Sequence, residues 1–99
     1  MEKLSYVYFL TNWHNTVIYI GVTTNLIKRT WQHKTHLVKG FSAKYKLSKL
    51  IYYEIFDSIK EAINREKQLK SGSRQQKIIL INSMNPDWKD LYLELVNNQ

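Results

Sequence analysis

The chain has 99 residues, enough for one domain, and 43% of them are hydrophobic, which is typical of a globular protein. It contains no cysteine, so disulfides and thiolate metal sites are excluded. The sequence has no apolar run long enough to span a membrane and no secretory signal pattern, so we expect a cytoplasmic protein without membrane association.

Positive charge is concentrated in the first half of the chain. The formal net charge is +7, residues 3–53 contain no Asp or Glu, and the basic and acidic side chains of residues 54–99 balance. This asymmetry favours a polyanionic partner, although a solvated lysine surface would have the same composition. The sequence contains no basic amphipathic helix with an apolar anchoring face, so it does not point to an anionic membrane as the partner. We therefore expect binding to nucleic acid, with DNA as the first candidate. The expected contacts are Lys28, Lys34, Lys39, Lys44 and Lys46.

Two strands and a helix are predicted at the start of the chain. Alternating apolar and aromatic residues predict a strand over 5–11, and the β-branched stretch 16–22 predicts a second strand, joined to the first by a polar turn. Thr and Asn residues at 23–25 are suitable N-caps for a helix that we expect to run to about His36 or Leu37.

A strand and further helices are predicted in the second half. The stretch 47–56 reads as the third strand. A capping-box pattern at 58–61 opens a helix that ends at Gly72, and the stretch 73–76 opens another helix. The stretch 85–92 begins with a proline stop and is expected to close with a short helix.

These elements predict an α+β fold, with a small antiparallel sheet of about three strands flanked by helices. We expect a single domain over 1–99. The helices at 58–70 and 74–83 could also form a helix-turn-helix that binds DNA. Against this alternative, the second of these helices is aliphatic through its middle, and the positive charge lies in the other half of the chain.

Two charged residues on the first predicted helix suit phosphate chemistry. Arg29 and His33 are four residues apart, so they share one face of the helix. A guanidinium is always charged and offers two parallel hydrogen bonds to a phosphate, and an imidazole exchanges its proton near neutral pH. An ordinary exposed Arg and His would show the same spacing, so the pair alone does not define a site.

One carboxylate falls on an apolar helix face. Glu66 lies within the stripe that Ile59, Ala62, Ile63 and Leu69 form on a helical wheel. A carboxylate that faces inward is costly unless it is paired with a cation or bound to a metal. A salt bridge to a lysine or arginine is one explanation, and a ligand for Mg²⁺ is the other.

Four stretches of the sequence, taken in order, resemble the motifs of the GIY-YIG nuclease family, and most closely its short stand-alone bacterial members. The stretches are YVY (6–8), YIG (19–21), NLIKRTWQH (25–33) and the glutamate-containing NREKQLK (64–70). The similarity extends from about residue 4 to residue 91. Tyr6 and Val7 replace the Gly and Ile of the first motif, and we interpret this departure as a change in strand packing.

The resemblance implies a metal-dependent endonuclease that hydrolyses phosphodiester bonds of DNA, with repair or recombination as its setting. The implied catalytic residues are Tyr8, Tyr19, Arg29, His33 and Glu66. Glu66 would hold Mg²⁺ or Mn²⁺, and Tyr8 would act as the general base once a cation lowers its pKa, with His33 relaying the proton.

Two further positions and several alternatives complete the prediction. Gly21 belongs to the second motif, and Asn85 is a loose match to a polar group that some members place near the site. A non-catalytic DNA-binding module with the same basic surface is the alternative function. A zinc site at His33 and His36 lacks further ligands at suitable spacing. RNA in place of DNA, and a protein partner for targeting, are left open by the sequence.

Overall fold

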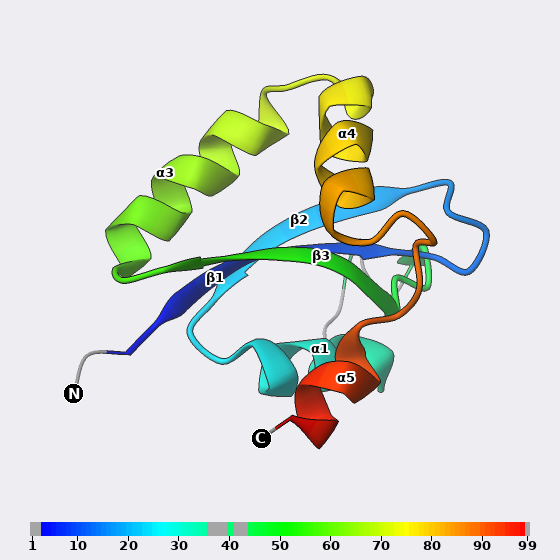
Figure 1. Ribbon diagram of the computed structural model, residues 1–99, viewed down its shortest axis with the longest axis horizontal. Helices are drawn as coiled ribbons and strands as arrows, with labels where there is room; N and C mark the ends of the chain where they lie inside the picture. Colours follow the sequence, from blue (N-terminus) through cyan, green and yellow to red (C-terminus); the bar gives the residue numbers. More distant parts are fainter. Residues whose placement is uncertain (1–2, 36–39, 41–43, 99) are drawn as a thin grey trace.

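The computed structural model describes residues 3–35, 40 and 44–98. Three antiparallel strands form one sheet in the order β2-β1-β3, so β2 and β3 are its edges. Helices cover both faces of the sheet, which confirms the expected α+β fold (Figure 1). In chain order the elements are β1 (Ser5–Thr11), β2 (Ile18–Thr23), α1 (Leu26–Lys34), β3 (Lys49–Phe56), α3 (Ile59–Lys70), α4 (Arg74–Met84) and α5 (Tyr92–Asn97).

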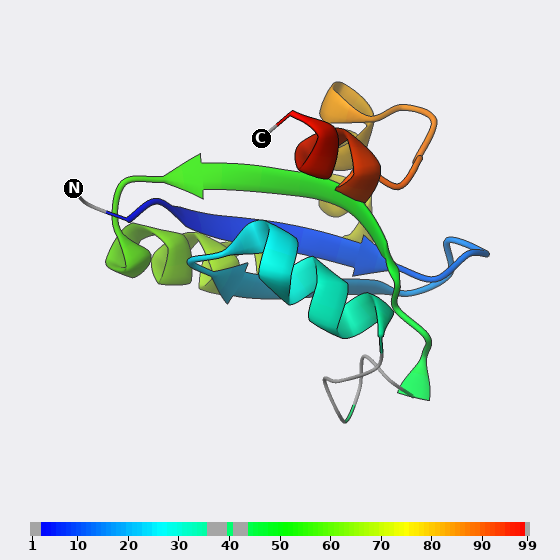
Figure 2. The ribbon, with the colours of Figure 1, turned by 90° about the horizontal axis from the view of Figure 1, so that it is seen from below.

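The central strand β1 sends its side chains alternately into two cores. Val7 and Phe9 pack in the core beneath α3 and α4, whereas Tyr8 and Leu10 pack in the core beneath α1 and α5. Figure 2, turned from the view of Figure 1, shows α1 and α5 on the second face. This parity places Tyr8 on the same side of the sheet as the helix that carries the predicted Arg and His.

Helix α1 begins where the sequence predicts and ends earlier than expected. The Asn25 side chain accepts a hydrogen bond from the backbone N–H of Lys28, which caps the first turn. The helix ends at Lys34, because the backbone leaves the helical conformation at Thr35, whose hydroxyl donates to the Trp31 carbonyl. The end expected at positions 36 and 37 lies outside the described residues.

The segment after α4 is irregular up to Leu91, so the last helix begins later than expected. The Asp90 carboxylate accepts hydrogen bonds from the backbone N–H groups of Leu50 and Tyr92, each at 3.1 Å. The backbone N–H of Leu91 donates to the Leu50 carbonyl at 2.8 Å. These bonds hold the segment along edge strand β3, and they depend on a strand far away in the sequence. No helix within the described ranges is both long and apolar enough to cross a lipid bilayer.

Helix α3 is rotated relative to the predicted apolar stripe. Ala62 is fully buried, but Ile59 and Ile63, which the stripe places inside, are exposed. The rotation follows from an ion pair with β3, in which the Arg65 guanidinium donates two hydrogen bonds to the Glu54 carboxylate at 2.8 and 3.0 Å. This geometry is bidentate, so it fixes the helix in both position and orientation.

Candidate active site

A buried hydrogen bond joins strand β1 to helix α1. Tyr8 Oη and His33 Nε2 lie 3.1 Å apart, and each side chain is only 1% exposed. The ring of Tyr19, on β2, lies 5.5 Å from the His33 ring and 6.3 Å from the Tyr8 ring, measured between centroids. Three predicted catalytic side chains therefore form one cluster beneath α1, and His33 is not an ordinary surface residue.

The glycine of the YIG stretch makes room for this cluster. Gly21 lies directly opposite Tyr8 in the β1–β2 ladder. A Cβ atom at Gly21 would lie 2.5 Å from Cζ of the Tyr8 ring, far inside van der Waals contact. The tyrosine can therefore lie across the strand and reach His33 only because position 21 has no side chain.

Burial sets the resting protonation of the Tyr8–His33 pair. It raises the pKa of Tyr8 to about 12, against the opposing influence of the Arg29 guanidinium. It lowers the pKa of His33 to about 4, and the positive charge of Arg29 adds to this effect. Arg29 alone therefore does not make Tyr8 a base, because desolvation of the phenol is the larger effect on its pKa, and the predicted role of Tyr8 depends on a bound metal as well. At neutral pH both side chains are uncharged.

Arg29 borders a hollow that is suited to a phosphate. The hollow has a volume of about 540 Å³ and includes three cations, Lys3, Lys28 and Arg29, but no carboxylate in its lining. It also includes Asn25, the N-cap of α1, and Ile59 at the start of α3. Since α1 and α3 cover opposite faces, the hollow passes around the end of edge strand β2, where an anion would meet fixed positive charge.

Glu66 lies on α3, across the sheet from the Tyr8–His33 pair. Its carboxylate is 3.3 Å from the ammonium group of Lys70, one helical turn away. Lys70 and Tyr19 line a common hollow of about 380 Å³ along the edge of β2, together with Lys77. Tyr19 and Lys70, the ion-pair partner of Glu66, therefore line one hollow, although the Tyr19 ring packs on the opposite face of the sheet from α3.

Among the predicted site residues, Glu66 supplies the carboxylate that Mg²⁺ would need. Within residues 3–35, 40 and 44–98, no three His, Asp or Glu side chains are grouped to form a metal site. Mg²⁺ needs only one or two carboxylates, because water and phosphate oxygens fill its remaining positions. The Glu66 side chain is 20% exposed, and its partner Lys70 is 54% exposed, so the ion pair is a weak surface pair that a cation can displace.

Asn85 is not brought to this group. Its side-chain amide donates to the carbonyls of Ile51 and Lys89 at 3.0 and 2.8 Å, and its oxygen accepts from the backbone N–H of Lys89 at 3.1 Å. Ile51 belongs to β3, the edge strand opposite β2. Asn85 therefore holds the irregular segment against the far side of the sheet, and this explains its burial without a role at the site.

Lys34, one of the expected nucleic-acid contacts, has a structural role. Its ammonium group donates to the Ser48 carbonyl at 2.8 Å, forms a salt bridge with Asp90 and lies over the ring of Tyr92. These partners come from the segment before β3, the segment before α5 and the start of α5 itself. Lys34 therefore links α1 to all three, and its charge is offset by Asp90.

Of the other four expected nucleic-acid contacts, the structure describes three. Lys28 is exposed beside the Arg29 hollow, and Lys44 and Lys46 are exposed before β3. Lys39 lies outside the described residues. Lys28, Lys44 and Lys46 are thus exposed, and their contact with nucleic acid stays a prediction.

The contrast between Lys44 and Lys34 gives a prediction for DNA binding. Lys44→Gln should reduce the slope of log Kd against log salt concentration by up to about one, because one phosphate contact is lost. Lys34→Gln should leave this slope unchanged and lower the free energy of unfolding by about 1–3 kcal/mol, because the Asp90 carboxylate loses its cation. Salt titrations by fluorescence anisotropy and urea unfolding would measure both. A reduced slope for Lys34→Gln would contradict the structural role.

Sequence reasoning missed two cations at the edge of β2. Lys70 and Lys77 lie in the half of the chain whose charges balance, so composition gives no reason to select them. The four-residue spacing of Glu66 and Lys70 is a signal that identifies one of the pair as the partner of the carboxylate. Nothing in the local sequence indicates that Lys77 lines the same hollow as Tyr19.

The sequence is similar to proteins of one family. The sequence matches the profile of the GIY-YIG catalytic domain over residues 4–79. A UPF0213 protein of Clostridium perfringens is 38% identical over 84 residues, which cover 81% of this chain and 85% of that protein. A UPF0213 protein of Staphylococcus haemolyticus is 39% identical over 80 residues, or 77% and 92% of the two chains.

A solved structure supports the fold. The solution NMR structure of a UPF0213 protein from Bacillus halodurans superimposes with a TM-score of 0.56, covering 88% of this chain and 92% of that one. The sequence identity between the two is 24%, so the likeness bears on the arrangement of helices and strands alone.

Proposed function

Because the chain belongs to the GIY-YIG catalytic-domain family, we propose that it is a metal-dependent endonuclease that hydrolyses phosphodiester bonds of nucleic acid, with DNA as the expected substrate. The observation that carries the proposal is the buried hydrogen bond between Tyr8 and His33, with Arg29 beside it. Burying two titratable groups against each other is costly for a merely structural core, and perturbed groups of this kind are concentrated at functional sites.

Arg29 is suited to hold the scissile phosphate. Its guanidinium borders the cation-lined hollow and also acts to lower the pKa values of both Tyr8 and His33. The Gln32 side chain accepts a hydrogen bond from Arg29 Nη1 at 3.3 Å, which limits the positions of the guanidinium. Charge that develops on the phosphate oxygens would be stabilised by this fixed cation.

The Tyr8–His33 pair is suited to move a proton. With a pKa of about 12, the Tyr8 phenol is ionised in only about one molecule in 10⁵ at neutral pH, so it cannot serve as a resident phenolate. The neutral His33 ring can accept the phenolic proton while the phenol accepts one from water. We assign the Tyr8–His33 pair as a proton relay; because Tyr8 is only 1% exposed, the attacking water must enter the cluster to reach its hydroxyl.

Glu66 would hold the divalent cation at the edge of β2. When bound there, Mg²⁺ or Mn²⁺ supplies positive charge that stabilises the departing oxygen of the phosphodiester. Tyr19, which lines the hollow at the β2 edge, would position water or phosphate there through its hydroxyl.

A nuclease assay tests the proposal. Wild-type protein with Mg²⁺ or Mn²⁺ should cleave at least one of duplex, single-stranded or branched DNA or RNA. Tyr8→Phe should lower the cleavage rate by about 10²–10⁴-fold, because the proton path is lost while the ring still packs. The matched control is Tyr53→Phe, a half-buried tyrosine in the same core, which should cleave at nearly the wild-type rate. If the protein bound DNA but cleaved no substrate under any condition, the result would favour the alternative function, a non-catalytic DNA-binding module.

A further inference from the structure

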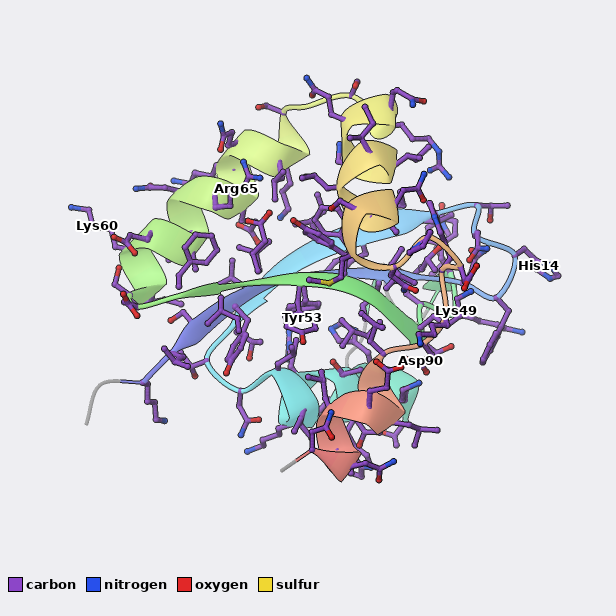
Figure 3. All side chains as sticks on the ribbon, viewed as in Figure 1. His14, Lys49, Tyr53, Lys60, Arg65 and Asp90 are labelled. Atoms are coloured by element: carbon purple, nitrogen blue, oxygen red, sulfur yellow. The ribbon has the colours of Figure 1, made fainter. Side chains whose placement is uncertain are left out.

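The turn between β1 and β2 holds an indole ring out in solvent. Trp13 is 68% exposed, more than any other large hydrophobic side chain in the described parts of the chain. Tryptophan is highly buried on average, so an exposed ring of this kind calls for a partner. The turn lies at one end of the molecule, where His14 extends outward (Figure 3).

The turn is internally bonded, so the exposure of Trp13 is built into the fold. The Asn12 side-chain oxygen accepts from the backbone N–H of Thr16 at 2.8 Å, and its amide donates to the Thr16 hydroxyl at 2.6 Å. The Arg74 guanidinium, on α4, donates to the Asn15 carbonyl at 3.1 Å. A turn fixed at both ends presents the ring without the entropic cost of ordering a loose loop.

One face of the indole lies over a cation. Lys49 Nζ is 5.5 Å from the centre of the Trp13 ring, and the Lys49 side chain is almost fully buried. The carboxylate that acts on Lys49 is Asp90, which is already paired with Lys34. Figure 3 shows Lys49 and Asp90 at the same end of the molecule as His14. Positive charge beneath an open aromatic face suits a flat ligand that carries negative charge nearby.

We propose that Trp13 is a stacking platform for an unpaired base of the nucleic acid. The inference rests on the proposed function and adds a preference for strands with exposed bases. Bases within a duplex are already stacked and cannot reach a protein ring, whereas those of a single strand, a junction or an overhang can. Stacking accepts any base, so this contact selects for strand structure and not for sequence.

The platform lies close to the candidate active site along the chain. Tyr19 pairs with Leu10 in the ladder, and Trp13 is three residues beyond Leu10. Three residues of extended chain span at most about 10 Å, so Trp13 lies near the end of the sheet at which Tyr19 enters β2. The Arg29 hollow lies at the other end of β2, beside Val22 and Thr23, so a nucleic acid strand that runs along the β2 edge past Tyr19 can reach both the hollow and Trp13.

Binding of matched oligonucleotides without divalent metal tests the proposal. We compare a single-stranded DNA with the duplex of the same sequence, by fluorescence anisotropy, for wild type, Trp13→Ala and Trp13→Phe. Trp13→Ala should weaken single-strand binding about ten- to a hundredfold and duplex binding less than about twofold, and Trp13→Phe should restore most of the loss. The control Leu93→Ala removes another strongly exposed apolar side chain, on α5, and should change neither affinity.

Several outcomes would overturn the proposal that Trp13 stacks on an unpaired base. Equal losses for single strand and duplex would indicate a backbone contact, and unchanged single-strand affinity would show that Trp13 contacts no base. If Trp13→Ala instead abolished self-association in sedimentation velocity, the ring would be a protein contact. Failure of wild type to bind any oligonucleotide would refute the proposed function itself, whereas normal wild-type binding with an insensitive Trp13→Ala refutes only this inference.

Discussion

Glu66→Gln is expected to lower metal-dependent cleavage by about two to three orders of magnitude while DNA binding stays at or above the wild-type level. The amide keeps the shape of the side chain but loses the charge that holds the cation. Stabilisation of the departing oxygen is worth several kcal/mol, and each 1.4 kcal/mol corresponds to about tenfold in rate. Binding should not weaken, because a negative charge beside the phosphate has been removed.

The ion pair with Lys70 is the competing explanation for the position of Glu66, and it predicts a different result from metal binding. As a partner of Lys70 alone, Glu66 would contribute about 0.3–0.5 kcal/mol to stability, as other surface pairs one helical turn apart do. Its substitution would then leave cleavage and metal response unchanged. Glu61→Gln is the matched control, because Glu61 is an exposed glutamate on the same helix.

The measurement is the single-turnover cleavage rate at saturating protein, over a range of Mn²⁺ concentrations. Wild type and Glu61→Gln should share one metal dependence, and Glu66→Gln should stay slow up to the highest concentration. A second readout is Mn²⁺ binding followed by electron paramagnetic resonance in the presence of a non-cleavable DNA, which should weaken for Glu66→Gln alone. Equal cleavage rates for Glu66→Gln and Glu61→Gln would exclude a metal-binding role for this carboxylate.

The fold was predictable where the signal is local. The first strand, expected at 5–11, is Ser5–Thr11 in the structure, because its alternating side chains fill two cores. The rotation of α3 and the late start of α5 were not predictable from their own segments. Arg65 pairs with Glu54 on a strand, and Asp90 binds the backbone of Leu50, forty residues away in sequence. Contacts of this kind override helix patterns and leave no local signature.

The candidate site, like the fold, was predictable only where the signal is local in the sequence. The spacing of Arg29 and His33 places both on one helix, and strand parity brings Tyr8 beneath that helix. Burial of His33 depends on the Tyr8 ring crossing Gly21, which is a tertiary fit that composition does not report. The raised pKa of Tyr8 follows from that burial, which outweighs the lowering by Arg29.

The stability of the protein should fall as the pH decreases from about 6.5 to about 4, because of His33. In the unfolded chain the imidazole has its ordinary pKa of 6.5, whereas burial and Arg29 lower the folded pKa to about 4. Between these values the unfolded state binds a proton that the folded state does not, so acid favours unfolding. The contribution is complete above pH 6.5 and is lost by about pH 4. It amounts to about 3 kcal/mol at 1.4 kcal/mol per pKa unit.

His33→Gln tests this directly, because the amide does not titrate. The variant should be less stable than wild type at pH 7.5, where the Tyr8 hydrogen bond is weakened, and its stability should change little between pH 6.5 and 4. His14→Gln, at the exposed turn, should retain the wild-type pH dependence. Urea unfolding of the three proteins at several pH values would measure the slopes.

Glu54 provides an internal reference for this experiment. Burial alone would raise its pKa, but its hydrogen bonds with Arg65 and Tyr52 outweigh that effect and lower it below 4.5. Its contribution to stability is therefore present above pH 4.5 and is lost as the pH falls through the lowered value, so most of the loss falls below the His33 window. A steep loss of stability between pH 6.5 and 4 that persists in His33→Gln would show that another group is responsible. The stability measurements would then no longer support a neutral His33, on which the proposed proton path depends.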